Sequence, residues 1–177
     1  METLPKFKLR EPLLILVVSI LGIWWLINTM NSGNPLWFFP IQPTYQPSRI
    51  VVHEYGTAVT LLPGMDEYDM LTTALNASLT GGFKNTALSS LGLSEETLRR
   101  YNERELALEI YYGEYIRFNT PIRMNKINQL LIPIDGTHSG YGYIFMGSSG
   151  AWRVGAIEVK NDEPLLMTMR ELGYLKE

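Results

Sequence analysis

No charged side chain occurs between Pro12 and Ser48. Within this run, residues 13–30 are almost continuously apolar, and at about 1.5 Å per residue they would form a helix about 27 Å long. That length matches the hydrocarbon core of a bilayer. A buried helix of a soluble protein would need a large surrounding core, which a chain of 177 residues does not easily build around its first helix. We therefore expect residues 13–30 to form a single transmembrane helix.

A cleaved signal peptide is the main alternative, because a basic start followed by an apolar stretch also describes one. The apolar stretch here is longer than the usual core of about 7–15 residues. Trp24 and Trp25 are bulky residues near its end, and no clear small-x-small cleavage site follows them. These features favour an uncleaved signal anchor in the cell membrane.

The basic residues on the two sides of this helix indicate its orientation. Lys6, Lys8 and Arg10 come just before the helix, whereas the next basic residue, Arg49, lies far beyond its end. Because basic flanks stay in the cytoplasm, we expect residues 1–12 to be cytoplasmic and the C-terminal domain to be extracytoplasmic. Trp24 and Trp25 would then lie at the outer interface, where indole rings prefer to be.

Residues 31–48 form a tether that we expect to be extended and stiff, because four prolines break any helix in it: Pro35, Pro40, Pro43 and Pro47. The tether also carries Trp37, Phe38 and Phe39. Exposing such a group to water is unfavourable at about 25 cal/mol per Å² of apolar surface. We expect lipid or a partner subunit to cover these rings, with burial in the domain's own core as the alternative.

Residues 49–177 have the pattern of a small α+β domain with a mainly antiparallel sheet and two or three helices. The first expected elements are a hairpin of residues 49–54 and 57–62 and a helix that Asp66 caps and that ends at Gly81-Gly82. They are followed by a loop at 83–93 with Leu88, Leu91 and Leu93 turned inward, a helix at 94–103 and a second hairpin that turns at Gly113. The last expected elements are strands at 129–134, 142–147 and 151–159 and a final helix that Asp162 and Pro164 begin.

Composition excludes several classes of site. Cysteine is absent, which excludes disulfides, thiolate nucleophiles, Fe–S clusters and cysteine-ligated zinc. The net charge is −3, and a mildly acidic domain does not suit nucleic-acid binding. The two histidines, His53 and His138, are distant in sequence and lack the spacing of metal ligands. We expect no cofactor.

The most site-like stretch is the loop at 135–143, which contains Asp135, Thr137, His138 and Ser139 among glycines. A hydrolase could use such residues, but a Ser-His-Asp triad is normally assembled from separate parts of a fold. The preferred interpretation is a glycine-bent connection whose polar side chains cap their own backbone. Similarly, residues 147–150 lack the Lys-Ser/Thr of a phosphate-binding loop and are typical of a hairpin turn.

Between Glu114 and Asp135 the only charged residues are Arg117, Arg123 and Lys126. They could meet anionic lipid or an acidic partner, or they could be unrelated charges on strand faces. The candidate interaction residues are therefore these three together with the five aromatic residues of the anchor and tether: Trp24, Trp25, Trp37, Phe38 and Phe39.

Architecture thus indicates a non-enzymatic, membrane-anchored accessory or scaffold subunit whose extracytoplasmic domain docks on a membrane protein complex. A sensor or regulatory module of a membrane signalling system is the first alternative. In topology alone, the layout resembles the YycH/YycI type of anchored regulators. A membrane-anchored hydrolase that uses the 135–143 loop is the second alternative.

Overall fold

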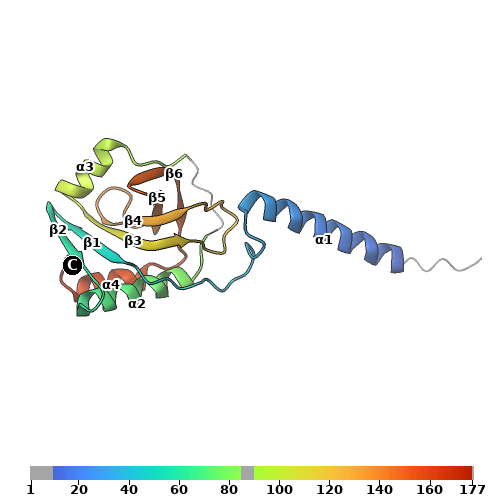
Figure 1. Cartoon of the computed structure of the whole chain (residues 1–177), viewed down its shortest axis with the longest axis horizontal. Helices are drawn as coiled ribbons and strands as arrows, with labels where there is room; N and C mark the ends of the chain where they lie inside the picture. The colour runs from blue at the N-terminus through green and yellow to red at the C-terminus, as the bar shows by residue number, and fades with distance from the viewer. Residues whose placement is uncertain (1–9, 85–89, 177) are drawn as a thin grey trace, which may run out of the picture.

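A computed structural model describes residues 10–84 and 90–176. Its first helix, α1 (Arg10–Ser32), projects away from a folded domain that the remaining elements form (Figure 1). The helix is long and apolar enough to cross a membrane, and its most apolar window has a mean hydropathy of 2.2 with none of it buried. Of the three basic residues on which the expected orientation rests, Lys6 and Lys8 lie outside the described residues, and Arg10 is the first residue of α1.

Six strands in the described part of the chain form one antiparallel sheet with the order β2-β1-β3-β4-β5-β6. The strands are β1 (Arg49–Glu54), β2 (Thr57–Leu61), β3 (Leu106–Ile116), β4 (Ile127–Asp135), β5 (Tyr143–Ser148) and β6 (Ala151–Glu158). From β3 onward each strand pairs with the next along the chain. The described residues between β2 and β3 include two helices, and this segment brings β3 back beside β1.

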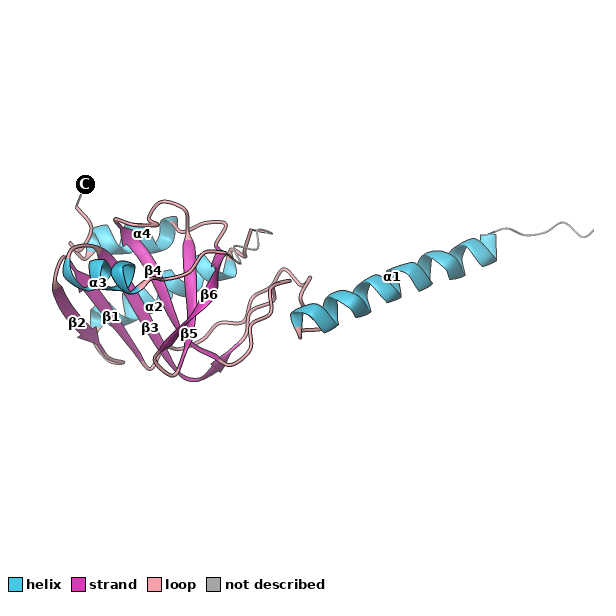
Figure 2. Cartoon of the chain, turned by 90° about the horizontal axis from the view of Figure 1, so that it is seen from above, coloured by secondary structure: helices cyan, strands magenta, loops and turns pink. Residues whose placement is uncertain are grey.

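Helices cover both faces of this sheet (Figure 1 and Figure 2). The helices α2 (Asp66–Thr80) and α4 (Glu163–Glu171) lie side by side on one face, and α3 (Glu95–Glu103) lies on the other. This confirms the expected α+β fold with a mainly antiparallel sheet and an N-terminal apolar helix.

The core has two parts because the side chains of a strand alternate between the faces of the sheet. On β3, Leu108 and Ile110 point into the larger cluster, which α2 and α4 close, whereas Ala107 points into a smaller cluster under Tyr101 of α3. Tyr101 is 1% exposed. The domain is therefore closed on both faces without help from α1.

Most of the expected elements are confirmed, including the hairpin that turns at Tyr55 and Gly56. Both turn residues have positive φ, at 45° and 100°, as a tight two-residue hairpin turn requires. The helix α3 begins as expected, since the Ser94 side chain accepts a hydrogen bond from the Thr97 N–H at 3.1 Å. Asp66, however, is the first helical residue of α2, and Met65 is the cap.

The second predicted hairpin, with its turn at Gly113, is wrong. The strand β3 continues through Gly113 to Ile116 and pairs with β4 on both sides of that glycine, up to Tyr111 and again at Ile116. Between Tyr111 and Ile116 the register shifts, so Gly113 lies in a bulged region of a strand. Glycine is common in such bulges as well as in turns. Of the three leucines expected to turn inward, Leu91 and Leu93 pack on the smaller cluster, and Leu88 lies outside the described residues.

The second half of the tether packs on the domain. Gln42 is buried, and the buried hydroxyl of Tyr68 donates a hydrogen bond to the Pro47 carbonyl. The Asn76 side chain, on α2, pairs with both the N–H and the carbonyl of Tyr45, at 3.3 and 3.2 Å. The folded unit therefore extends back from β1 to Gln42.

Candidate membrane interface

The chain reverses direction where α1 ends. Gly33 has a φ of 68°, and the Ser32 hydroxyl accepts a hydrogen bond from the Asn34 N–H at 3.2 Å. The Trp25 indole N–H then donates to the Pro35 carbonyl at 3.2 Å. These contacts fold the start of the tether back along the last turns of α1.

This reversal gathers the five predicted aromatic residues at one end of α1. We call them the aromatic junction: Trp24, Trp25, Trp37, Phe38 and Phe39. The rings of Trp24 and Trp37 meet edge to face with centroids 5.1 Å apart, and Phe38 packs on Trp37 with centroids 5.6 Å apart. Aromatic rings at the end of an apolar helix are typical of the membrane interface.

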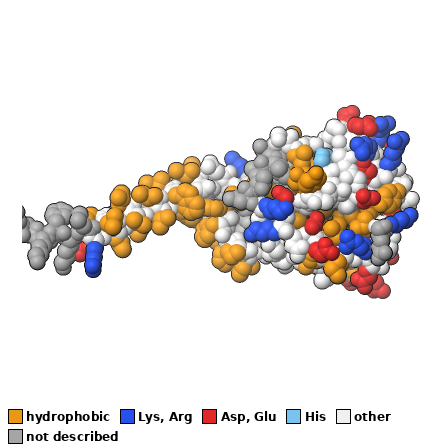
Figure 3. Space-filling view, turned by 180° about the vertical axis from the view of Figure 1, so that it is seen from behind, with side chains coloured by type: hydrophobic (Ala, Val, Ile, Leu, Met, Phe, Trp, Pro, Cys, Tyr) orange, Lys and Arg blue, Asp and Glu red, His pale blue; other side chains and the backbone are white. Residues whose placement is uncertain are grey.

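The outer part of the aromatic junction is open to solvent. Phe38 and Phe39 are 55% and 41% exposed, and neither belongs to the domain's core. Apolar side chains of α1 and apolar side chains at this end of the domain form one continuous surface (Figure 3). The structure thus disagrees with the alternative that these rings are buried in the domain's own core.

The loop between β3 and β4, residues 117–126, ties the tether to the domain. Asn119 is central to this connection, because its side chain accepts a hydrogen bond from Asn34 Nδ2 at 2.9 Å and donates one to the Ile41 carbonyl at 2.7 Å. Its backbone N–H and carbonyl also pair with the Gln42 side-chain amide, at 2.7 and 2.8 Å. The end of α1 is therefore joined to the domain by several bonds.

The three predicted basic residues lie on this same β3–β4 loop rather than on strand faces. Arg117 donates from Nη1 to the Gly33 carbonyl at 3.0 Å, which puts a positive charge at the C-terminal end of α1, where the helix dipole favours it. Arg123 and Lys126 are exposed. Asn125, between these two residues in the sequence, lies near Gly33, because a β-carbon added to that glycine would be 3.8 Å from Asn125 Oδ1. The loop thus adjoins the end of α1.

The polar side chains of the 135–143 loop each have a separate partner. Asp135 accepts a hydrogen bond from the Tyr55 hydroxyl at 2.7 Å, and the Ser139 hydroxyl donates to the Gly136 carbonyl at 2.7 Å. His138 Nδ1 lies 2.9 Å from the Tyr101 hydroxyl. Because Asp135, His138 and Ser139 bond elsewhere, they do not form a nucleophile, base and orienting acid.

Hydrogen bonds and backbone conformation give other residues of this loop a structural role. The N–H and hydroxyl of Thr137 both donate to the Glu105 carboxylate at 2.8 Å. Burial lowers the pKa of His138, an effect that nearby Glu105 opposes and Arg100 reinforces. His138 also has a positive φ of 66°, as expected for a residue in a tight connection.

A second polar cluster lies on β1 and β3. His53 Nε2 is 3.5 Å from Glu109 Oε1, and the Tyr111 hydroxyl donates to the same carboxylate. Burial raises the pKa of Glu109, but the bonds from His53 and Tyr111 and the charge of Arg49 outweigh it, so the pKa is lowered. In the described ranges, no three His, Asp or Glu side chains gather as a metal site would need.

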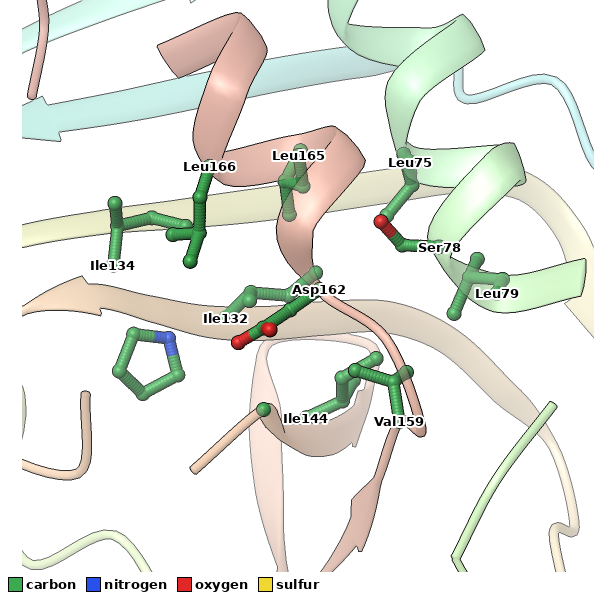
Figure 4. A pocket seen from close by; sticks show the side chains of 12 residues that line it. Leu75, Ser78, Leu79, Ile132, Ile134, Ile144, Val159, Asp162, Leu165 and Leu166 are labelled. Carbon is green, nitrogen blue, oxygen red and sulfur yellow. The ribbon is translucent and has the colours of Figure 1, made fainter. Parts of the chain in front are cut away.

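One enclosed cavity lies between α2, α4 and the sheet (Figure 4). Its volume is about 10 Å³, which is the space of a single water molecule. The lining is mainly apolar, and the buried Ser78 hydroxyl within it has no hydrogen-bond partner among the described residues. The cavity is too small for an organic ligand.

Sequence reasoning missed Asn34, Gln42 and Asn119, whose hydrogen bonds join the junction to the domain. Asn34 and Asn119 are 85 positions apart, so no local pattern joins them.

Comparison of the chain with protein families, with curated proteins and with solved structures finds no match. The candidate site is therefore described by its own geometry, an apolar helix with an aromatic and basic junction at its end.

Proposed function

We propose that the protein is a single-pass, membrane-anchored accessory or scaffold subunit. Its N-terminus is cytoplasmic, α1 crosses the cell membrane, and its extracytoplasmic domain docks on a membrane protein complex. The main supporting observation is the junction, in which Asn119 and Arg117 bond the domain to the segment that leaves α1. A domain joined in this way keeps one orientation relative to the bilayer.

The remaining polar side chains favour a binding role over chemistry. The residues of the 135–143 loop make hydrogen bonds within the fold, and His53 Nε2 lies 3.5 Å from Glu109 Oε1. The large exposed apolar surface, in contrast, lies at the junction around Phe38 and Phe39. Exposed apolar patches of this kind mark membrane or protein contacts.

Native sizing of the full-length protein after mild detergent extraction tests the proposal. We expect a discrete assembly much larger than one 20.2 kDa chain with its detergent. Asn119→Ala should weaken the assembly, because the domain is then held less firmly in one orientation relative to α1. Asn102→Ala, at an exposed position of α3, should leave the assembly intact. A lone monomer in native membrane extracts would contradict an accessory-subunit role.

A further inference from the structure

A groove lies at the end of the domain nearest to α1, and we call it the junction groove. Its volume is about 520 Å³, which is within the range of about 300–1,000 Å³ that is usual for ligand sites. One part of its wall is aromatic: Trp24, Trp37, Phe38 and Phe39. Another part carries Lys84 and Lys160, which come from the end of the α2 connection and from the end of β6.

The two lysines are held beside each other by a short backbone pairing. Phe83 and Val159 form an isolated antiparallel bridge. Next to it, the Lys84 N–H donates to the Glu158 carbonyl at 2.8 Å, and the Lys160 N–H donates to the Gly82 carbonyl at 3.0 Å. Both lysines therefore have a defined backbone position, although they are far apart in sequence.

The Lys160 side chain lies close to the backbone at Gly82. The φ of Gly82 is 87°, and a β-carbon there would come within 3.8 Å of Lys160 Nζ. The ammonium group thus lies over the turn that follows α2. This places a positive charge on the wall of the junction groove.

The charges of the groove are unbalanced. Lys84 pairs with Glu158, but Lys160 makes no ion pair with any carboxylate in the described part of the chain. None of the described residues that line the groove is acidic. A negatively charged group is the complement to this wall.

We infer that the junction groove binds the headgroup of an anionic phospholipid from the leaflet in which α1 ends. The phosphate lies against Lys160, with Lys84 beside it, and the apolar part of the lipid lies along Trp24 and Phe38. This inference rests on the proposed function, because it needs α1 to be in a bilayer. Trp24 belongs to that helix, so a lipid at its surface reaches the groove without leaving the membrane.

A phospholipid fits both halves of the groove, since it carries a charged group and an apolar group within one small molecule. Basic residues at a membrane surface attract anionic lipids, at about a five-fold gain in affinity for each lysine. A water-soluble anion would use only the two lysines and would leave Phe38, which is 55% exposed, uncovered.

Native mass spectrometry of the full-length protein in detergent tests the inference. The protein is given equal amounts of phosphatidylglycerol and phosphatidylcholine with identical acyl chains, and the retained lipids are counted. We expect wild type to prefer phosphatidylglycerol and Lys160→Gln to reduce that preference about five-fold. Lys160→Arg, which keeps the charge, and Arg104→Gln, on the far side of the domain, should preserve it. Circular dichroism checks that each variant is folded.

Equal retention of the two lipids by wild type, or an unchanged preference in Lys160→Gln, would overturn the inference. If Lys160→Gln leaves the lipid ratio unchanged but breaks up the native assembly, the groove binds a protein partner, so the lipid inference fails while the proposed function stands. If the lipid preference depends on Lys160 but the native protein is a monomer, the lipid inference stands and the accessory-subunit role fails.

Discussion

The indole ring of Trp24, near the end of α1, packs edge to face on the indole ring of Trp37, with ring centroids 5.1 Å apart. These residues belong to two antiparallel segments, because the chain reverses at Gly33. The contact places Trp37 beside Trp24, Phe38 packs on Trp37, and Phe39 lines the same groove as these three rings. If α1 spans a bilayer with Trp24 at the interface, the whole aromatic junction lies at that interface too.

The first prediction concerns the exposed rings. Changing Trp37, Phe38 and Phe39 to serine should move the domain away from the bilayer but leave its core intact, because these side chains lie outside both core clusters. A spin label on Asn125→Cys reports depth in nanodiscs, and hydrogen exchange of β3 and β4 reports stability.

The matched control changes Tyr141 and Met167, which are each 59% exposed and lie outside both core clusters, to serine. Neither the depth of the label nor the exchange of the sheet should change in this control. Loss of several kcal/mol of core stability in the aromatic variant would show instead that the aromatic junction is part of the fold.

The second prediction concerns Asn119. Replacing it with alanine removes the partner of the Ile41 carbonyl and leaves the Asn34 amide only its longer bond, of 3.4 Å, to the Phe118 carbonyl, at a cost of about 2 kcal/mol. The loss is local, so the amides of residues 34–42 should exchange about ten-fold faster or more, with little change in β1 or β3. If the amides of residues 34–42 exchange at the wild-type rate in Asn119→Ala, the Asn119 bonds do not hold this segment on the domain.

The third prediction tests whether the second half of the tether belongs to the domain. Tyr68 is fully buried, and its hydroxyl bonds to the Pro47 carbonyl. Tyr68→Phe should therefore lower the free energy of unfolding by about 1–2 kcal/mol, since the carbonyl stays buried without a donor. Tyr115→Phe, at a side chain that is 58% exposed, should have almost no effect. Equal urea midpoints for the two variants would argue that the tether is a free spacer.

The fourth prediction concerns alkaline pH. Burial and the bond to Asp135 raise the pKa of Tyr55 to about 12, and burial and the bond to Glu109 raise the pKa of Tyr111 to about 12. Because the folded state holds these protons more tightly, their stabilisation is complete below pH 10 and is lost as the pH rises towards 12.

Urea unfolding between pH 9 and 12 measures this loss. The double variant Tyr55→Phe and Tyr111→Phe should show a shallower fall in stability over that window than wild type, since phenylalanine has no proton to lose. Identical slopes for the two proteins would show that these hydroxyls are not held in their neutral form by the fold.

Sequence patterns predicted most of the domain because its elements are locally encoded. Short apolar runs between turn residues predict β1, β4, β5 and β6, alternating apolar residues predict the first half of β3, and helical spacing with clear ends predicts α2 and α4. Gly113 was misread because the same residue permits a turn or a bulge, and the choice depends on pairing with β4, which lies later in the chain.

The candidate site was predictable only in part. The aromatic residues and the basic loop stand out in the sequence by composition, but their meeting at the end of α1 depends on the reversal at Gly33 and on long-range bonds of Asn119. The Lys84–Lys160 pairing depends on one isolated backbone bridge. Contacts of this kind leave no periodic pattern, so they could not be inferred before the fold was known.

The central claim, that α1 anchors the domain outside the cytoplasm, is tested most directly by cysteine accessibility in intact cells. The chain contains no cysteine, so single substitutions Glu2→Cys and Lys176→Cys give unambiguous signals with a membrane-impermeant maleimide. We predict labelling of Lys176→Cys in intact cells and labelling of Glu2→Cys only after permeabilisation. Labelling of both positions from the same side, or a mature chain that lacks α1, would contradict the membrane-anchored arrangement.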